Sequence, residues 1–125
     1  MATVTFNAVF GITPGYGHNN EQDASIGLSR TAEFWQQAME KELASSGIFA
    51  SAVMSKAVVV YPMANGCPPS GETVIQAVGV LNPKYINVEY EAQYRQAVDK
   101  WKDAVKRIVK AVKTELKQER VTLYF

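Results

Sequence analysis

Two helix-length amphipathic stretches, each lying between runs of alternating apolar residues, constrain the fold of this chain more than any other feature. Apolar alternation predicts a first strand over residues 3–10. Helical spacing then predicts a helix over residues 30–46, with Ser29 as its N-cap and Gly47 beyond its C-cap. Two further strands are expected at residues 49–61 and 72–81, separated by turn-forming residues.

The last part of the chain predicts the longest element, a helix of about 30 residues that would span about 45 Å. Asn87 is placed to cap it, acidic residues occupy its first turn, and Lys113 and Lys117 occupy its last turn, as the helix dipole favours. Residues 121–125 alternate again and predict a closing strand. A chain of 125 residues is too short for two independent cores, so residues 1–125 are expected to form one domain.

The order β-α-β-β-α-β predicts an α+β protein with the ferredoxin-like βαββαβ arrangement. This arrangement is a four-stranded antiparallel sheet with two helices on one face, of which the C-terminal one is long. In that topology the three least regular segments lie at one end of the sheet. These segments are residues 11–28, 62–71 and 118–120. We therefore expect a binding site at this end.

Most candidate binding residues lie in the glycine-rich segment that follows the first strand. Glycines let a backbone approach a ligand closely, and an aromatic ring there can stack on a ligand ring. Arginines at the first helix and before the last strand would meet an anion, with Gln118 and Glu119 as further candidates. The candidate ligand-binding residues are Gly15, Tyr16, Gly17, His18, Asn19, Arg30, Cys67 and Arg120.

No catalytic signature stands out in the sequence. The glycines are not followed by the Lys-Ser/Thr of a P-loop, nor do they form a dinucleotide fingerprint. His18 is the only histidine and Cys67 the only cysteine, so neither a histidine nor a cysteine metal cage is expected, and no intrachain disulfide. We accordingly expect no metal, no cofactor and no assigned catalytic residue.

Charge is distributed unevenly along the chain. Residues 95–120 hold nine of the 13 basic residues but only four of the 12 acidic ones. Such a basic helix face could follow a phosphate backbone, but no aromatic residues interleave with the lysines, so nucleic-acid binding is not expected. No apolar run is long enough to span a bilayer, and the N-terminus does not resemble a signal peptide. We expect a cytoplasmic protein without membrane contact.

Both faces of the predicted sheet carry apolar residues, although helices cover only one. Val58 and Val60 lie on one side of the second strand, and Ala57 and Val59 lie on the other. Such a face is typical of an interface. We expect a homodimer or a higher homo-oligomer. The alternative is that residues 11–28 cover the second face.

These features together predict a non-enzymatic protein that sequesters a small anionic, nucleotide-like ligand at the loop-rich end of a homo-oligomer. The element order is similar to that of many small ferredoxin-like proteins, including dimeric α+β barrels and small viral or bacterial ligand-binding proteins. A first alternative is therefore a cofactor-free enzyme of the dimeric α+β barrel type that uses His18 with Cys67 or Tyr16. A second alternative is a protein–protein interaction module.

Overall fold

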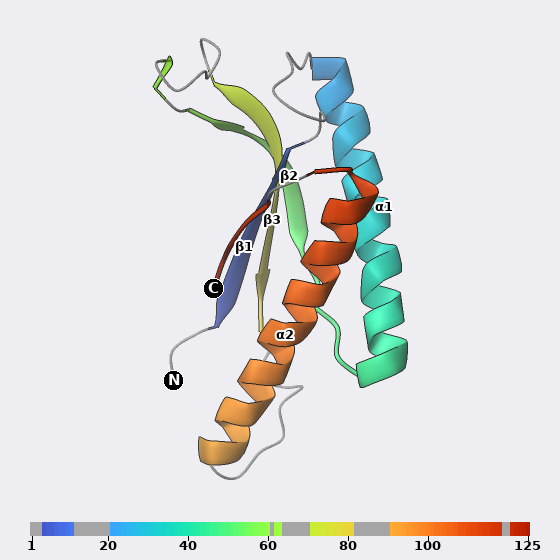
Figure 1. Ribbon diagram of the computed structural model, residues 1–125, viewed down its shortest axis with the longest axis vertical. Coiled ribbons are helices and arrows are strands. Elements are labelled where there is room, and N and C mark those ends of the chain that lie inside the picture. Colours follow the sequence, from blue (N-terminus) through green and yellow to red (C-terminus); the bar gives the residue numbers. More distant parts are fainter. Residues whose placement is uncertain (1–3, 12–20, 61, 64–70, 82–90, 119–120) are drawn as a thin grey trace.

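The computed structural model describes residues 4–11, 21–60, 62–63, 71–81, 91–118 and 121–125 (Figure 1). The element order is the predicted one. Its elements are β1 (Thr5–Gly11), α1 (Glu21–Ser46), β2 (Val53–Val59), β3 (Glu72–Val80), α2 (Glu91–Glu115) and β4 (Val121–Tyr124).

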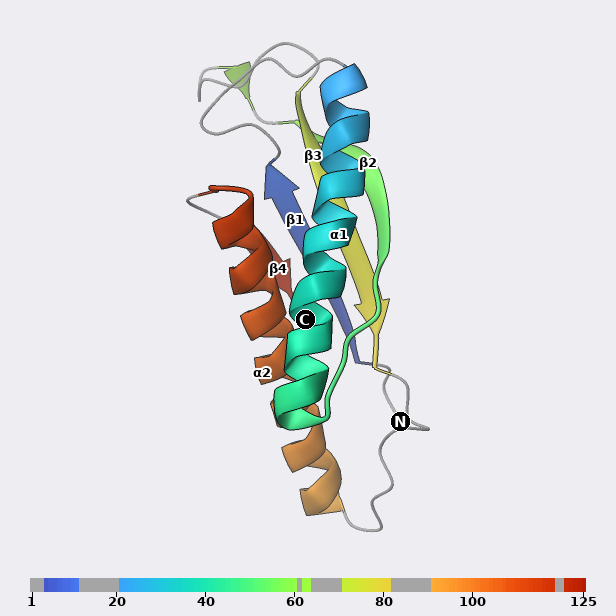
Figure 2. The ribbon, with the colours of Figure 1, turned by 90° about the vertical axis from the view of Figure 1, so that its right-hand side faces the viewer.

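The four strands form one antiparallel sheet in the order β2-β3-β1-β4. This order is the one that two interleaved βαβ-type crossovers produce, so the ferredoxin-like prediction is confirmed. Both helices pack on the same face of the sheet (Figures 1 and 2). Successive residues of β1 alternate between that face, where Phe6, Ala8 and Phe10 are buried, and the face turned away from the helices.

Helix α1 begins at Glu21, so the prediction that Ser29 caps a helix starting at residue 30 is wrong. The start was predicted too late because the buried side of the first part of the helix carries small residues. Gly27 and Thr31 are both buried, and the Thr31 hydroxyl donates a hydrogen bond of 2.7 Å to the Gly27 carbonyl. Together with buried Trp35 they form a stripe at a spacing of four residues. Small side chains in that stripe carry little hydrophobic signal, which hides the first turns in the sequence.

Helix α2 has 25 described residues, about 37 Å at the usual rise, and the predicted cap Asn87 lies outside the described residues. It ends in a Schellman motif. The Lys117 amide donates to the Thr114 carbonyl and the Gln118 amide donates to the Lys113 carbonyl, both at 3.1 Å. Lys117 occupies the left-handed position with φ of 57°. Because glycine is the usual residue at this position, a lysine there does not indicate the end of a helix.

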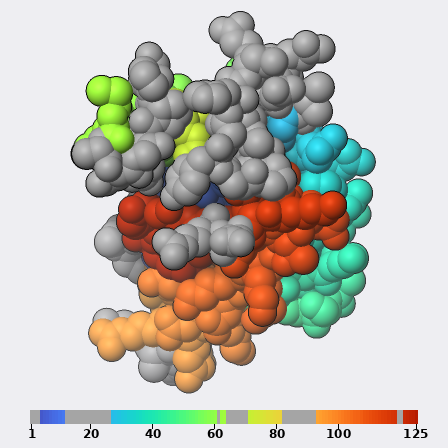
Figure 3. Space-filling view, turned by 45° about the horizontal axis from the view of Figure 1, so that its top comes forward, coloured from blue at the N-terminus to red at the C-terminus, as the bar shows by residue number. Residues whose placement is uncertain are grey.

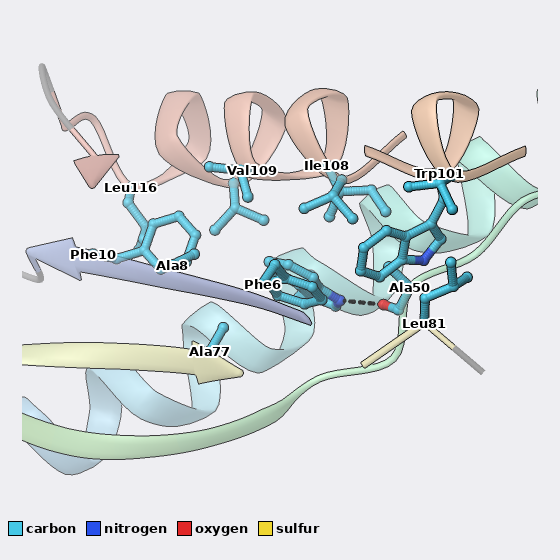
Figure 4. Close-up of a cluster of buried hydrophobic side chains, with 14 residues drawn as sticks. Phe6, Ala8, Phe10, Ala50, Ala77, Leu81, Trp101, Ile108, Val109 and Leu116 are labelled. Atoms are coloured by element: carbon cyan, nitrogen blue, oxygen red, sulfur yellow. Dashed lines mark hydrogen bonds between the residues drawn. The ribbon is translucent and has the colours of Figure 1, made fainter. Parts of the chain in front are cut away.

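An aromatic cluster joins the sheet to both helices (Figure 4). The Phe6 ring stacks on Trp35 of α1 with a centroid distance of 5.4 Å and lies 5.8 Å from the Trp101 ring of α2. The indole N–H of Trp35 donates a hydrogen bond of 2.9 Å to the Ala50 carbonyl, drawn as the dashed line in Figure 4. This bond satisfies a buried donor and fixes the segment that enters β2.

The face of the sheet turned away from the helices carries both polar and apolar side chains, and several of the apolar ones are exposed, as predicted. Its exposed apolar side chains come from three strands. They are Val53, Val78, Val80 and Tyr124. The polar contact on this face is a hydrogen bond of 3.2 Å from Gln76 Nε2 to Asn7 Oδ1. Exposed apolar side chains that gather on one face of a sheet often mark an interface.

Candidate functional site

The strand ends that flank the irregular segments converge at one end of the sheet, as predicted. Gly11, where β1 ends, pairs with Val74 near the start of β3. Val59, the last residue of β2, pairs with Glu72, and Phe10 pairs with Val121 at the start of β4. The start of α1 and the end of α2 point the same way (Figures 1 and 2). We call this the loop-rich end; Figure 3 looks toward it, with β3 in yellow and the C-terminal part of α2 in orange to red.

Seven of the eight predicted ligand-binding residues lie outside the described residues. They are Gly15, Tyr16, Gly17, His18, Asn19, Cys67 and Arg120. Arg30 is described, and it is exposed on α1. It lies nine residues after Glu21, so its predicted place at the start of the helix is wrong, while its role as a ligand-binding residue stays a prediction. The free N–H groups that bind anions belong to the first turn of a helix.

Gln118 is the described residue with the most unusual environment at this end. Its Nε2 atom is buried and has no hydrogen-bond partner within the described part of the chain. The side chain lies over Gly11: a Cβ atom on Gly11 would be 2.7 Å from Gln118 Oε1. Natural proteins rarely leave a buried N–H donor unpaired, because its desolvation is not compensated. The sequence analysis named Gln118 as a further candidate because it precedes the last strand, but the burial of its side chain could not be predicted from the sequence.

Glu72 is the only acidic residue in the described strands. It is half-buried, begins β3 and lies beside Val59 on the sheet face turned away from the helices. The sequence analysis did not select it, because a single acid at the start of a strand is an ordinary surface feature. Its place at the loop-rich end makes it available to a cationic group of a ligand.

A second carboxylate is buried between the two helices. Glu42 of α1 accepts hydrogen bonds from Arg107 Nε of α2, at 3.0 Å to each carboxylate oxygen, and one of 2.9 Å from the Ser46 hydroxyl. Arg107 holds the pKa of the Glu42 carboxyl below its usual range, and burial opposes this effect only in part. The arrangement joins α1 to α2 and leaves the carboxylate fully occupied, so it serves packing and not ligand binding.

A cavity of about 490 Å³ lies at the end of the molecule opposite Gly11. It is bounded by the residues between α1 and β2, the end of β3 and one side of α2. The described residues around it are Gly47, Ile48, Phe49, Ala50, Ser51, Val80, Leu81, Ala97, Lys100 and Trp101. Lys100 is its one charged lining residue among these, and the cavity holds none of the predicted site residues.

The described residues contain no group of three or more His, Cys, Asp or Glu side chains placed to hold a metal ion. In the same part of the chain no helix is both long and apolar enough to cross a membrane.

Comparison with known proteins gives one match. A family model described as SAM lyase matches residues 1–125, the whole length of the chain, and the chain therefore belongs to the SAM lyase family. No curated protein and no solved structure gives a significant match. The family places the chain among enzyme-like proteins, which favours the enzyme alternative over a protein that only sequesters its ligand.

Proposed function

We propose that this member of the SAM lyase family cleaves S-adenosylmethionine at the loop-rich end. The observation that carries the proposal is the family match over all 125 residues. The convergence of Gly11, Val59 and Val121 at that end supports the location. The predicted binding residues from Gly15 to Asn19, with Cys67 and Arg120, remain part of this proposal.

The family description changes the expected charge of the ligand. S-adenosylmethionine carries an adenosine, which agrees with a nucleotide-like ligand. Its sulfonium and ammonium groups outweigh its carboxylate, however, so the ligand is a cation and not the anion expected from Arg30 and Arg120. A half-buried carboxylate would attract such a cation, whereas an arginine would repel it. Glu72 is the acidic residue in the described strands.

The chemistry of a lyase fits a site without an assigned acid or base. In the proposed step a carboxylate oxygen of the substrate attacks the γ-carbon of its methionine chain, which is bonded to sulfur. The attack closes a five-membered lactone. The bond between that carbon and sulfur breaks, and its electron pair stays on sulfur as methylthioadenosine leaves. No proton is transferred and neither water nor an oxidant is consumed. The site has to fold the substrate into the reactive conformation, a positioning effect that can supply much of the barrier reduction.

Electrostatics then assigns a role to Glu72. The negative carboxylate and the positive sulfonium of the substrate neutralise each other as the bond forms, so a dry site favours the reaction. A protein carboxylate held against the sulfonium would stabilise the ground state more than the transition state. The ammonium group keeps its charge throughout, and we propose that Glu72 binds this group.

Steady-state kinetics with S-adenosylmethionine test the proposal. We expect the purified protein to turn over the substrate repeatedly and to release methylthioadenosine. Glu72→Gln is expected to raise KM about tenfold or more with a smaller change in kcat, as loss of uniform binding does. Glu33→Gln, an exposed position on α1, is the matched control and should leave both constants unchanged. Stoichiometric binding with the substrate recovered intact would instead support the sequestering function.

The exposed apolar face of the sheet supports a second part of the proposal, that a second copy of this chain covers it. Val53, Val80 and Tyr124 are exposed there. The same apolar side chains on another copy can pack against them and exclude water. Most soluble oligomers are symmetric assemblies of identical chains. Location in the cytoplasm stays a prediction of the sequence.

A further inference from the structure

The amide nitrogen of Gln118 presents an unmet hydrogen-bonding requirement at the loop-rich end. Its Nε2 atom is buried, and within the described residues it has no hydrogen-bond partner. A buried donor of this kind destabilises the fold unless an acceptor pairs with it. A ligand acceptor that reached Nε2 on binding would satisfy this donor.

The end of α2 holds this side chain in position. The amide of Gln118 is bonded to the Lys113 carbonyl at 3.1 Å, which closes the Schellman motif and fixes the backbone from which the side chain extends. The motif requires Lys117 to adopt a left-handed φ of 57°, an unfavourable conformation for a residue with a side chain. The backbone of Gln118 is thus fixed at the end of α2.

Gly11 provides the space that the carboxamide occupies. With any larger residue at position 11, the Cβ atom would lie 2.7 Å from Gln118 Oε1 and 3.3 Å from its Cδ. These separations are below normal contact distances, so a side chain there would displace the carboxamide. Two separate sequence features, Gly11 at the end of β1 and the turn after α2, therefore place one carboxamide at this end.

We propose that Gln118 recognises the adenine edge of the substrate. The inference rests on the proposed function, which supplies an adenosine-containing ligand. A carboxamide offers one donor and one acceptor side by side, and a glutamine pairs with adenine by donating to a ring nitrogen and accepting from the exocyclic amino group. The carboxylate of the substrate is a less suitable partner, because a hydrogen bond to it would weaken the nucleophile of the proposed step.

Methylthioadenosine and methylthioinosine provide the test, since they differ only at the edge that the carboxamide would contact. Inosine carries a carbonyl oxygen in place of the amino group and a protonated ring nitrogen beside it. We expect the wild-type protein to bind methylthioadenosine about tenfold or more tightly than methylthioinosine, measured by calorimetry. In Gln118→Met, which keeps the size of the side chain but removes both hydrogen-bonding atoms, this preference should fall to about twofold or less.

A stability measurement accompanies the binding measurement. Because Gln118→Met removes an unpaired buried donor, the ligand-free variant is expected to unfold at the same temperature as the wild type or above it. Gln36→Met, at an exposed position on α1, is the matched control and should change neither stability nor nucleoside preference.

Each result decides the matter. Loss of the nucleoside preference in a fully stable Gln118→Met supports adenine recognition. A preference equal to the wild type's overturns it and leaves the lyase function standing. A Gln118→Met variant that is less stable while its preference is unchanged assigns the carboxamide to structure and also overturns it. If the wild-type protein binds neither nucleoside and does not consume S-adenosylmethionine, the proposed function fails and the inference fails with it.

Discussion

Gly79 is the residue at which the core leaves no room for a side chain. It lies on β3 opposite Phe6, and a Cβ atom there would be 2.3 Å from Phe6 Cε1 and 2.5 Å from the Ser51 carbonyl oxygen. The Phe6 ring cannot move away easily, because it is stacked on Trp35 and lies against Trp101. The absence of a side chain at this position therefore sets the distance between β3 and the aromatic cluster.

We expect Gly79→Ala to lower the free energy of unfolding by about 2 to 3 kcal/mol, since the added methyl overpacks the core. Chemical denaturation followed by tryptophan fluorescence measures this change. Gly47→Ala is the matched control, because nothing lies within 4 Å of the added Cβ and only the left-handed φ of 75° opposes the substitution. It should lower stability by about 1 kcal/mol. Equal losses in the two variants would contradict the packing argument.

At the residue scale, the sequence did not predict which polar side chains are buried or which residues they contact. Nothing in the pattern around Glu42 distinguishes it from exposed Glu40, because its burial depends on Arg107, 65 residues away. Glu72 was not selected and the burial of Gln118 was not predicted, since the exposure of a polar side chain is decided by tertiary packing. A sequence pattern locates such residues on an element but does not reveal their partners.

Among the elements, the ion pair between Glu42 and Arg107 links the two helices beside their apolar packing. Glu42 is buried, while the Arg107 side chain is about half exposed, so solvent screens one partner of the pair. The hydrogen bonds from Arg107 lower the pKa of Glu42 in the folded protein relative to the unfolded chain. A carboxyl whose pKa is lowered on folding stabilises the protein above its unfolded-state pKa, about 4.3 for glutamate.

The pH dependence of stability follows from that sign. We expect the wild type to be more stable than Glu42→Gln by a constant amount near neutral pH. The difference should shrink as pH falls below about 4.3 and vanish once Glu42 is protonated in the folded protein. Urea unfolding of both proteins between neutral pH and about pH 3 tests this. Exposed Glu40→Gln should show little difference from the wild type, and a pH-independent difference for Glu42→Gln would contradict the pair's role.

Element order was predictable from periodicity, whereas element boundaries were not. The strands alternate between a buried and an accessible face, and α2 has apolar residues at helical spacing along its length, so their types were clear. The start of α1 was missed because Gly27 and Thr31 are buried without being hydrophobic. The end of α2 was extended too far because Lys117 stands where glycine is usual.

For the whole molecule, the exposed apolar residues on the sheet face turned away from the helices predict self-association. We expect the wild-type protein to form a homo-oligomer at micromolar concentration, measured by size-exclusion chromatography with light scattering. The double variant Val53→Asp and Val80→Asp should run as a monomer of 13.8 kDa. Its fold should be intact because these side chains are 76% and 54% exposed, so the charges need not enter the core.

Val58→Asp is the matched control for that experiment. Val58 is 56% exposed, but it pairs with Thr73 and lies on the other side of β2 from Val53. The control should therefore keep the oligomeric state of the wild type. A monomeric wild type would contradict the proposal and would favour the alternative in which another part of this chain covers the face.

The central claim is that the chain splits S-adenosylmethionine without adding water. Incubation with the substrate in water enriched in heavy oxygen, with products analysed early in the reaction by mass spectrometry, tests it most directly. The account predicts methylthioadenosine together with unlabelled homoserine lactone, because the ring oxygen comes from the substrate's own carboxylate. Homoserine labelled at its hydroxyl from the first time point would show hydrolysis instead, and S-adenosylmethionine recovered intact would show a binding protein; either result would contradict the account.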